Sequence, residues 1–230
     1  VASLFQRNSI IKTIKKTAKN ILIPLTVGGG IRSIKDIFEI LSAGADKVAI
    51  NTITIRKPQF IDLSAKKFGS STIVVQIEAS KSLNGKYYAL TDNGRQETKK
   101  EAVRWAQEIE KRGAGEILLT SIDKEGTGEG LDLELINLVS NAVKIPVIAH
   151  GGVGKYEDVK KALELTKIDG VAISSLLHYS AMKKVKNNLS NTFEGNFEFI
   201  KNYKDFKNFS KYNLSDLKKF LIKKKVSIRN

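Results

Sequence analysis

Two glycine runs, each directly after a short apolar segment, are the first residues in this sequence whose types and spacing suggest chemistry. Gly28, Gly29 and Gly30 follow IPLTV, and Gly151 and Gly152 follow IPVIAH. Glycine lets a bound group approach the backbone closely, and the amides that open a following helix attract anions. Each run therefore predicts a phosphate site, with a tight turn alone as the structural alternative.

Small polar residues end the next apolar segment after each glycine run. Asn51 and Thr52 follow KVAI, and Ser174 and Ser175 follow GVAI. Their amide and hydroxyl groups can hydrogen-bond the same phosphates as the neighbouring glycines. The duplication favours binding over turns alone, and it predicts a small-molecule substrate with a phosphate at each end.

Acidic residues and a threonine fall between the two predicted phosphate sites. Glu78 ends the apolar segment TIVVQI, Thr120 ends EILLT, and Asp123 and Glu125 lie in the loop that follows. Carboxylates at strand ends suit general acid and base catalysis. Glu78 has little structural reason to end a buried strand, whereas Glu125 could equally be a solvated loop charge.

The two histidines carry weaker signals. His150 precedes the second glycine run, where it could donate to a phosphate or pack beneath the loop, and the sequence leaves both open. His178 is expected to be structural. Because no spacing of histidines and carboxylates resembles a metal site, we expect neither a metal nor a cofactor.

Alternating strands and helices must position these residues. The hairpin prediction rests on two Asn-Gly pairs around alternating residues at 84–94. Strands buried on both faces, each followed by a helix, predict a parallel sheet. Strands are predicted at 24–28, 47–51, 72–78, 116–120, 145–149 and 170–174, and helices at 9–20, 33–43, 58–68, 101–113, 131–143 and 156–165.

An internal repeat separates a barrel from an open sheet. Residues 23–52 match residues 145–175, and Pro24 and Pro146 lie 122 residues apart. This spacing is about half of a (β/α)8 barrel of some 250 residues. We therefore predict an α/β fold, a (β/α)8 TIM barrel of half-barrel type. Its two phosphate sites should face each other at the C-terminal ends of the strands.

Composition restricts the class of protein. The 230 residues are 41% hydrophobic and 27% charged, without cysteine, which fits one soluble, cytoplasmic domain and excludes disulfides. No apolar stretch reaches the roughly 20 residues of a membrane span. The net charge of +15 could indicate a nucleic-acid partner, but most of it lies in residues 181–230 and most basic residues are lysine. We expect no nucleic acid.

Four segments together resemble the cyclase subunit of imidazole glycerol phosphate synthase, an enzyme family of histidine biosynthesis. The resemblance covers about residues 1–180 and 213–229. A related phosphoribosyl isomerase shares the half-barrel repeat, but GAGEILLTSID and the hairpin at 84–94 are similar to the cyclase. The segments are LTVGGGIRSIKDIFEILSAGADKVAINT, GAGEILLTSIDKEGTGEGLDLELI, IPVIAHGGVGKYEDV and LKKFLIKKKVSIR.

This resemblance implies a barrel paired with a glutaminase subunit that makes ammonia. Ammonia would pass through the barrel and attack a bisphosphate formimino-aminoimidazole-carboxamide ribonucleotide, which yields imidazole glycerol phosphate and an aminoimidazole carboxamide ribotide. Lys47 and Glu116 match residues that gate ammonia entry, and Asp46 matches an acid that contacts the glutaminase. Gly30, Asn51 and Thr52 would hold one phosphate, Gly152, Ser174 and Ser175 the other, and Thr120 would line the reaction centre.

Three positions depart from the family pattern. The acids matching Glu78 and Glu125 are usually aspartate, and position 150, here His150, is usually serine. Because a displacement of 1 Å can cost about a hundredfold in rate, these changes suggest a different substrate or compensating shifts. One alternative is a paralogue that supplies ammonia for amidation of an N-acetyl sugar in surface-polysaccharide biosynthesis. Another is a non-catalytic, glutaminase-binding ammonia conduit.

The family has a first strand, a helix after it and a second strand that would lie before Val1, the first residue of this sequence. A partner catalytic aspartate and two gate residues belong to that part of the family. We therefore expect six of eight strands, two open strand edges and a chain that aggregates or is inactive alone. Residues 188–213 are predicted as an insertion before the last helix. Their mixed basic and aromatic residues could bind single-stranded nucleic acid, but packing on the barrel is expected instead.

Overall fold

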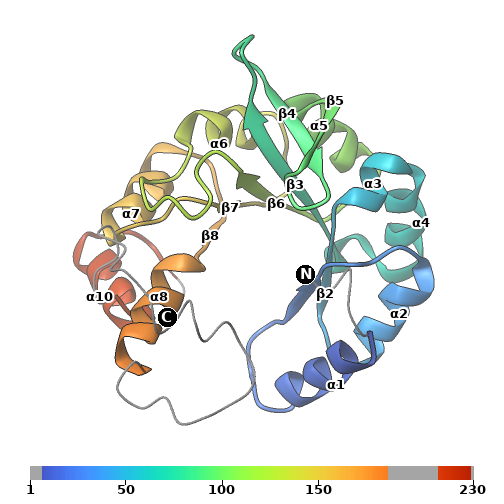
Figure 1. Ribbon diagram of the computed structural model, residues 1–230, viewed down its shortest axis with the longest axis horizontal. Coiled ribbons are helices and arrows are strands. Elements are labelled where there is room, and N and C mark those ends of the chain that lie inside the picture. The colour runs from blue at the N-terminus through green and yellow to red at the C-terminus, as the bar shows by residue number, and fades with distance from the viewer. Residues whose placement is uncertain (1–6, 186–211, 229–230) are drawn as a thin grey trace.

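The computed structural model describes residues 7–185 and 212–228, which form a ring of parallel strands surrounded by helices (Figure 1). The parallel strands are β1 (Thr26–Gly28), β2 (Lys47–Ile50), β3 (Ile73–Lys81), β6 (Glu116–Ser121), β7 (Val147–His150) and β8 (Gly170–Ala172). The helices are α1 (Arg7–Ala18), α2 (Ile34–Ser42), α3 (Thr52–Arg56), α4 (Gln59–Phe68), α5 (Ala102–Lys111), α6 (Leu133–Ser140), α7 (Tyr156–Leu165), α8 (Ser175–Val185) and α10 (Leu214–Lys223), with a short 3-10 turn at Ser70–Thr72.

The six strands pair in the order β1-β2-β3-β6-β7-β8, and every pair on this path is parallel. Helices connect consecutive strands, as in a (β/α)8 barrel. The α/β barrel prediction is therefore confirmed. Among the described residues β1 pairs only with β2 and β8 only with β7, so this part of the ring is open between β8 and β1.

The predicted hairpin is present but larger than expected. β4 (Tyr87–Thr91) pairs antiparallel with the end of β3 on one side and with β5 (Gln96–Glu101) on the other. We did not predict β5, because the segment QETKKE has none of the apolar residues that mark a strand; its side chains are exposed or half-buried at the sheet edge. We also missed α3, whose β-branched sequence TITIR favours a strand.

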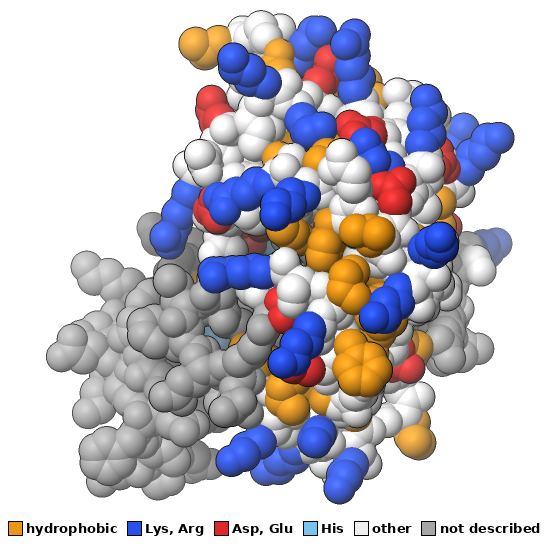
Figure 2. Space-filling view, turned by 90° about the vertical axis from the view of Figure 1, so that its right-hand side faces the viewer, with side chains coloured by type: hydrophobic (Ala, Val, Ile, Leu, Met, Phe, Trp, Pro, Cys, Tyr) orange, Lys and Arg blue, Asp and Glu red, His pale blue; other side chains and the backbone are white. Residues whose placement is uncertain are grey.

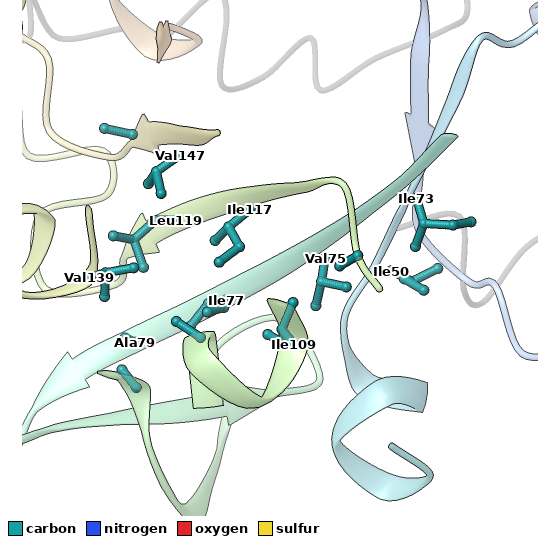
Figure 3. Close-up of a cluster of buried hydrophobic side chains, with 14 of the residues drawn as sticks. Ile50, Ile73, Val75, Ile77, Ala79, Ile109, Ile117, Leu119, Val139 and Val147 are labelled. Carbon is teal, nitrogen blue, oxygen red and sulfur yellow. The ribbon is translucent and has the colours of Figure 1, made fainter. Parts of the chain in front are cut away.

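Alternation along the strands separates an outer apolar face from an inner face. On the outer face, Ile77, Ile117 and Leu119 pack with Ile109 of α5 and Val139 of α6 (Figure 3). All five are at most 1% exposed, and burial of each such side chain stabilises the fold by about 1.5–3 kcal/mol. The inner face of β2, β3, β6 and β7 carries polar residues, namely Lys47, Gln76, Glu78, Glu116, Thr120 and His150, with Asn51 directly after β2.

The outer surface mixes charged and apolar side chains. Figure 2 shows the side that carries α2, α3 and α4, where lysine and arginine are spread among acidic and apolar side chains. Phe38 of α2 and Leu63 of α4 are exposed, at 57% and 58%. Exposed apolar side chains of this kind are common on globular proteins. No helix within residues 7–185 or 212–228 has the length and apolar character needed to span a bilayer.

The C-terminal helix is anchored to α7. The Tyr156 hydroxyl donates to the carbonyl oxygen of Asn213 at 2.8 Å, and its ring centroid lies 4.4 Å from that of Tyr212. Asn213 caps the N-terminus of α10 by accepting the Asp216 amide. The predicted insertion at 188–213 lies outside the described residues except for its last two, and its role stays a prediction.

Candidate active site

The predicted reaction-centre residues lie side by side at the C-terminal ends of the central strands. Glu78 of β3 is the register partner of Thr120 of β6, which in turn is the partner of His150 of β7. Thr120 Oγ1 and His150 Nδ1 lie 3.1 Å apart, within hydrogen-bond distance. Neighbouring parallel strands thus bring together three residues that are far apart in the sequence.

Glu78 is a buried carboxyl held by several donors. Its side chain is 8% exposed. Oε2 accepts from Asn51 Nδ2 at 3.0 Å and from the Gly94 amide at 2.8 Å, and Oε1 accepts from Gln76 Nε2 at 3.1 Å. These bonds fix both carboxylate oxygens on the inner face of the barrel.

Burial raises the pKa of the Glu78 carboxyl above its usual range. The negative charges of Glu125 and Asp92 act in the same direction, whereas the hydrogen bonds from Gly94 and Asn51 oppose them by favouring the charged form. A carboxyl shifted toward neutral pH exchanges protons more readily at the operating pH of most enzymes. The environment of Glu78 is therefore suited to general acid and base catalysis.

The first glycine run forms a turn between β1 and α2. Gly29 and Gly30 have φ angles of 100° and 70°, a conformation that favours glycine. After the run, Ser33 is the N-cap of α2, and Asp36 Oδ2 accepts the amides of Arg32 at 2.7 Å and Ser33 at 2.9 Å. Gly29 and Gly30 line a cavity of about 30 Å³ against α1 and α2.

Asn51 and Thr52, the predicted partners of this run, are engaged with protein groups. Asn51 Nδ2 donates to Glu78 and, at 3.4 Å, to the carbonyl oxygen of Leu90. Its Oδ1 is buried and has no hydrogen-bond partner in the described part of the chain. Thr52 Oγ1 accepts the Asp92 amide at 3.1 Å, which leaves its own hydroxyl proton available to a ligand.

The second glycine run borders a larger pocket, of about 100 Å³. Gly151 and Gly152 have φ angles of 100° and 102°. A Cβ on Gly152 would lie 2.2 Å from the carbonyl oxygen of Gly130, so loop packing alone already requires glycine here. The pocket is lined by Glu125, Gly126, Gly128, His150, Gly151, Gly152, Val153, Ala172, Ile173, Ser174 and Ser175.

Glu125 therefore shares a pocket with the second predicted phosphate site. Its side chain is exposed, and its amide donates to the carbonyl oxygen of Ser121 at 3.0 Å. Within the described residues its carboxylate has no hydrogen-bond partner. The carboxylate can thus meet a ligand in the pocket, while its charge also acts on Glu78.

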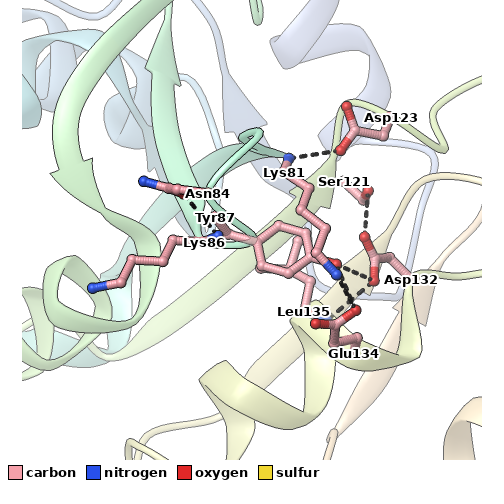
Figure 4. Close-up of polar contacts among 9 residues, drawn as sticks. All are labelled: Lys81, Asn84, Lys86, Tyr87, Ser121, Asp123, Asp132, Glu134 and Leu135. Carbon is pink, nitrogen blue, oxygen red and sulfur yellow. Dashed lines mark hydrogen bonds and ion pairs between the residues drawn. The ribbon is translucent and has the colours of Figure 1, made fainter.

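The loop that carries Glu125 is tied to the end of β3 and to the start of β4 (Figure 4). Asp123 Oδ2 accepts the Lys81 amide at 2.8 Å, so this predicted acid serves to anchor the loop. Asp132 accepts from Ser121 Oγ and from the Tyr87 hydroxyl, each at 3.1 Å. Burial and the neighbouring carboxylates raise the pKa of Tyr87 and keep its hydroxyl a donor.

Replacing Tyr87 by phenylalanine is expected to lower the free energy of unfolding by about 1 kcal/mol, because Asp132 loses a donor. Chemical denaturation measures the change. Tyr88→Phe is the matched control, since the neighbouring Tyr88 hydroxyl only accepts from Asn84 at an exposed position. Equal effects of the two substitutions would contradict an anchoring role for Tyr87.

The opposite end of the strands holds the residues predicted to gate ammonia entry. Lys47 Nζ and Glu116 Oε2 form an ion pair at 2.6 Å that reaches across β3. Asp46, beside them, accepts the Leu25 amide at 2.8 Å, and Asp169 accepts the Val147 amide at 3.0 Å. Each aspartate directly precedes a strand of its half of the repeat and accepts an amide near the start of the preceding strand. The two halves of the internal repeat therefore make equivalent contacts.

Sequence reasoning missed four residues around Glu78. Gln76 was visible as the single polar residue of an apolar strand, two positions before Glu78. Gly94 was predicted only as part of a turn. No sequence signal linked Arg56 or Asp92 to the site, because their ion pair joins α3 to the hairpin. Among the described residues, no three side chains of the metal-ligating types gather in one place.

Comparison with known proteins agrees with the resemblance. The chain matches the family model described as "Histidine biosynthesis protein" over residues 1–183. It is 54% identical over 158 residues to the imidazole glycerol phosphate synthase subunit HisF of Legionella pneumophila, which covers 69% of this chain and 74% of that protein. The HisF subunit of Campylobacter concisus is 49% identical over 187 residues, or 80% of this chain and 73% of that protein. The HisF subunit of Hydrogenobaculum is 47% identical over 178 residues, or 77% of this chain and 71% of that protein.

Proposed function

Since the chain belongs to the histidine biosynthesis protein family, we propose that it acts as the cyclase subunit of an imidazole glycerol phosphate synthase. Its substrate is a bisphosphate formimino-aminoimidazole-carboxamide ribonucleotide, and its products are imidazole glycerol phosphate and an aminoimidazole carboxamide ribotide. The observation that carries this proposal is the position of Glu78. It is a buried carboxyl among strand ends that also carry both glycine runs.

The substrate is held by its two phosphates. One lies against Gly29 and Gly30 with Asn51 and Thr52, where the Thr52 hydroxyl donates to a phosphate oxygen. Because both Asn51 amide protons already have acceptors, Asn51 exchanges one of them for the phosphate when substrate binds. The second phosphate occupies the pocket of about 100 Å³, against Gly151, Gly152, Ser174 and Ser175.

Glu78, which lies between the two phosphate sites, accepts and returns protons during the reaction. The nitrogen of ammonia replaces a carbonyl oxygen of the substrate, which leaves as water, so this nitrogen must lose protons while the departing amine must gain one. A carboxyl with a raised pKa can accept the first proton and return it later. Glu125 provides a second carboxylate from the pocket side, and Thr120, aligned by His150, lines the centre between them.

Ammonia enters at the opposite end of the barrel, where a glutaminase subunit binds. The Lys47–Glu116 ion pair lies on the inner face at this end and blocks or opens the route, and Asp46 contributes to the docking surface.

Lys47→Met is expected to lower glutamine-dependent turnover several-fold while turnover with ammonium salt stays unchanged. Steady-state assays of the complex measure both. Lys35→Met, which breaks an exposed ion pair with Glu39, is the control, and an equal loss of both activities by Lys47→Met would refute the gate.

A second candidate function is the supply of ammonia for amidation of an N-acetyl sugar. His150 favours it, because an imidazole bonded to Thr120 takes room in the substrate pocket where the family pattern has a serine. Glu78 and Glu125, where the family pattern usually has the shorter aspartate, also favour this second function. Turnover of the bisphosphate ribonucleotide by the purified full-length protein would favour the cyclase. Ammonia transfer to a sugar only in the presence of a separate amidotransferase would favour the alternative.

A further inference from the structure

The turn between β4 and β5 lies against Glu78, although the hairpin is an excursion from the barrel. Three successive residues of this turn, Asp92, Asn93 and Gly94, have positive φ angles of 54°, 61° and 71°. Asn and Asp tolerate this left-handed conformation better than other side chains, and Gly adopts it freely. The turn aims the Gly94 amide at Glu78 Oε2, 2.8 Å away.

Contacts on both sides hold this turn in place. Arg56 Nη2 of α3 forms an ion pair with Asp92 Oδ2 at 2.8 Å, and the Asp92 amide donates to Thr52 Oγ1 at 3.1 Å. On the other side, a Cβ on Gly94 would lie 2.7 Å from Cδ1 of Ile122, at the start of the loop that carries Glu125. The turn is thus fixed between α3 and the loop that carries Glu125.

We propose that the ion pair of Arg56 with Asp92 is a clasp that holds the Gly94 amide against the Glu78 carboxylate. Arg56 and Asp92 are then positioning residues, which act on the reaction only through Gly94 and Glu78. The proposal rests on the proposed function for the catalytic role of Glu78. The contacts that define the clasp are present whether or not Glu78 is catalytic.

The clasp stabilises the charged form of Glu78. A backbone amide that donates to a carboxylate lowers its pKa and opposes the effect of burial. The charged groups that raise the pKa of Glu78 are Asp92 from the turn and Glu125 from the loop after β6. When the clasp opens, Gly94 moves away and the pKa of Glu78 rises.

The clasp also links Glu78 to the first phosphate site through one hydroxyl. Thr52 Oγ1 accepts from the Asp92 amide and can donate its proton to a phosphate oxygen. A phosphate on Thr52 would orient this hydroxyl and favour the closed turn. Substrate binding and the position of the catalytic carboxyl are coupled in this way.

Two substitutions separate the clasp from a direct effect of charge. Arg56→Met removes a positive charge, so its direct effect raises the pKa of Glu78. Asp92→Asn removes a negative charge, so its direct effect lowers that pKa. Both substitutions open the clasp, however, so the clasp predicts a rise in both variants. Asparagine also tolerates the left-handed conformation at position 92, which preserves the turn itself.

The experiment is a pH titration of the Glu78 carboxyl carbon by NMR in the full-length protein, with Glu78→Gln to assign the signal. We expect a higher pKa of Glu78 in both variants, and exchange of the Gly94 amide faster by about two- to fivefold, the range for loss of an exposed ion pair. Arg104→Met, which breaks an exposed pair with Glu101 on the same hairpin, should change neither.

A lower pKa in Asp92→Asn, or unchanged Gly94 exchange in either variant, would overturn the clasp. These measurements need no turnover, so they also distinguish the two proposals. An inactive wild-type protein with the expected shifts would refute the cyclase and leave the clasp. An active protein without the shifts would do the reverse.

Discussion

Replacing Glu78 by glutamine is expected to lower kcat by about 10²- to 10⁴-fold, the contribution typical of a general acid or base, with little change in KM. Glutamine keeps the length of the side chain and can still accept the Gly94 and Asn51 hydrogen bonds. In the proposed function the phosphates of the substrate bind away from Glu78, so affinity should be preserved. Steady-state kinetics with ammonium salt tests this, and full activity of the variant would exclude Glu78 as the general acid or base.

The same substitution should stabilise the protein at neutral pH. Because the folded-state pKa of Glu78 is raised, folding favours its protonated form. The stability that this group contributes is fully present below its unfolded pKa and is lost as pH rises through the folded pKa. Glu78→Gln should therefore unfold at a higher temperature than wild type near pH 7, and the difference should shrink toward pH about 4, the ordinary pKa of glutamate.

Thermal unfolding at several pH values measures this difference. A variant that is less stable than wild type across the whole range would contradict the raised pKa. Higher stability together with lower activity would show that burial of Glu78 serves catalysis at a cost in folding free energy.

Replacing Gly152 by alanine is expected to lower the free energy of unfolding by about 2–4 kcal/mol, which combines backbone strain with overpacking. The φ angle is 102°, and the new Cβ would lie 2.2 Å from the Gly130 carbonyl oxygen. The loop that carries Glu125 would then shift away from the pocket. Turnover should fall as well, because Glu125 and the second phosphate site depend on this packing.

Gly126→Ala is the matched control for this substitution. Gly126 lies in the same loop with a φ angle of 77°, but a Cβ there would meet no atom within 4 Å. The control therefore isolates the strain of the left-handed backbone, about 1–2 kcal/mol. Chemical denaturation compares the two variants. If Gly152→Ala cost no more than Gly126→Ala, the packing of the loop on Gly152 would not be what fixes the pocket.

The strand and helix pattern predicted which residues meet at the site. The apolar runs that end at Glu78, Thr120 and His150 form adjacent parallel strands, so their ends lie together. The repeat of glycine runs placed both runs at the same end of the barrel. Periodicity and duplication carry this information because a parallel sheet puts all strand ends on one edge.

Contacts between separate loops could not be predicted in the same way. Glycine at 152 suggested close approach of a phosphate, but the nearest group is the backbone of Gly130. Asp123 suggested acid–base chemistry, but it accepts the backbone amide of Lys81 at the end of β3. In both cases the partner lies on a separate segment of the chain, and the local sequence does not specify which segment packs there.

The lengthened acid at position 78 has a structural counterpart. Both of its carboxylate oxygens have donors, which come from Asn51 just after β2, from β3 and from the hairpin turn. Gln76 and Gly94 thus meet the carboxylate where the longer side chain places it. A compensated position of this kind is compatible with retained catalysis, and it makes the identity of the substrate a question for direct assay.

The most direct test is turnover of the bisphosphate ribonucleotide by the full-length protein with ammonium salt in place of the glutaminase. We predict that the substrate is consumed, that imidazole glycerol phosphate and the aminoimidazole carboxamide ribotide appear in equal amounts, and that Glu78→Gln suppresses both. No consumption of the bisphosphate by a folded full-length protein would contradict the cyclase function.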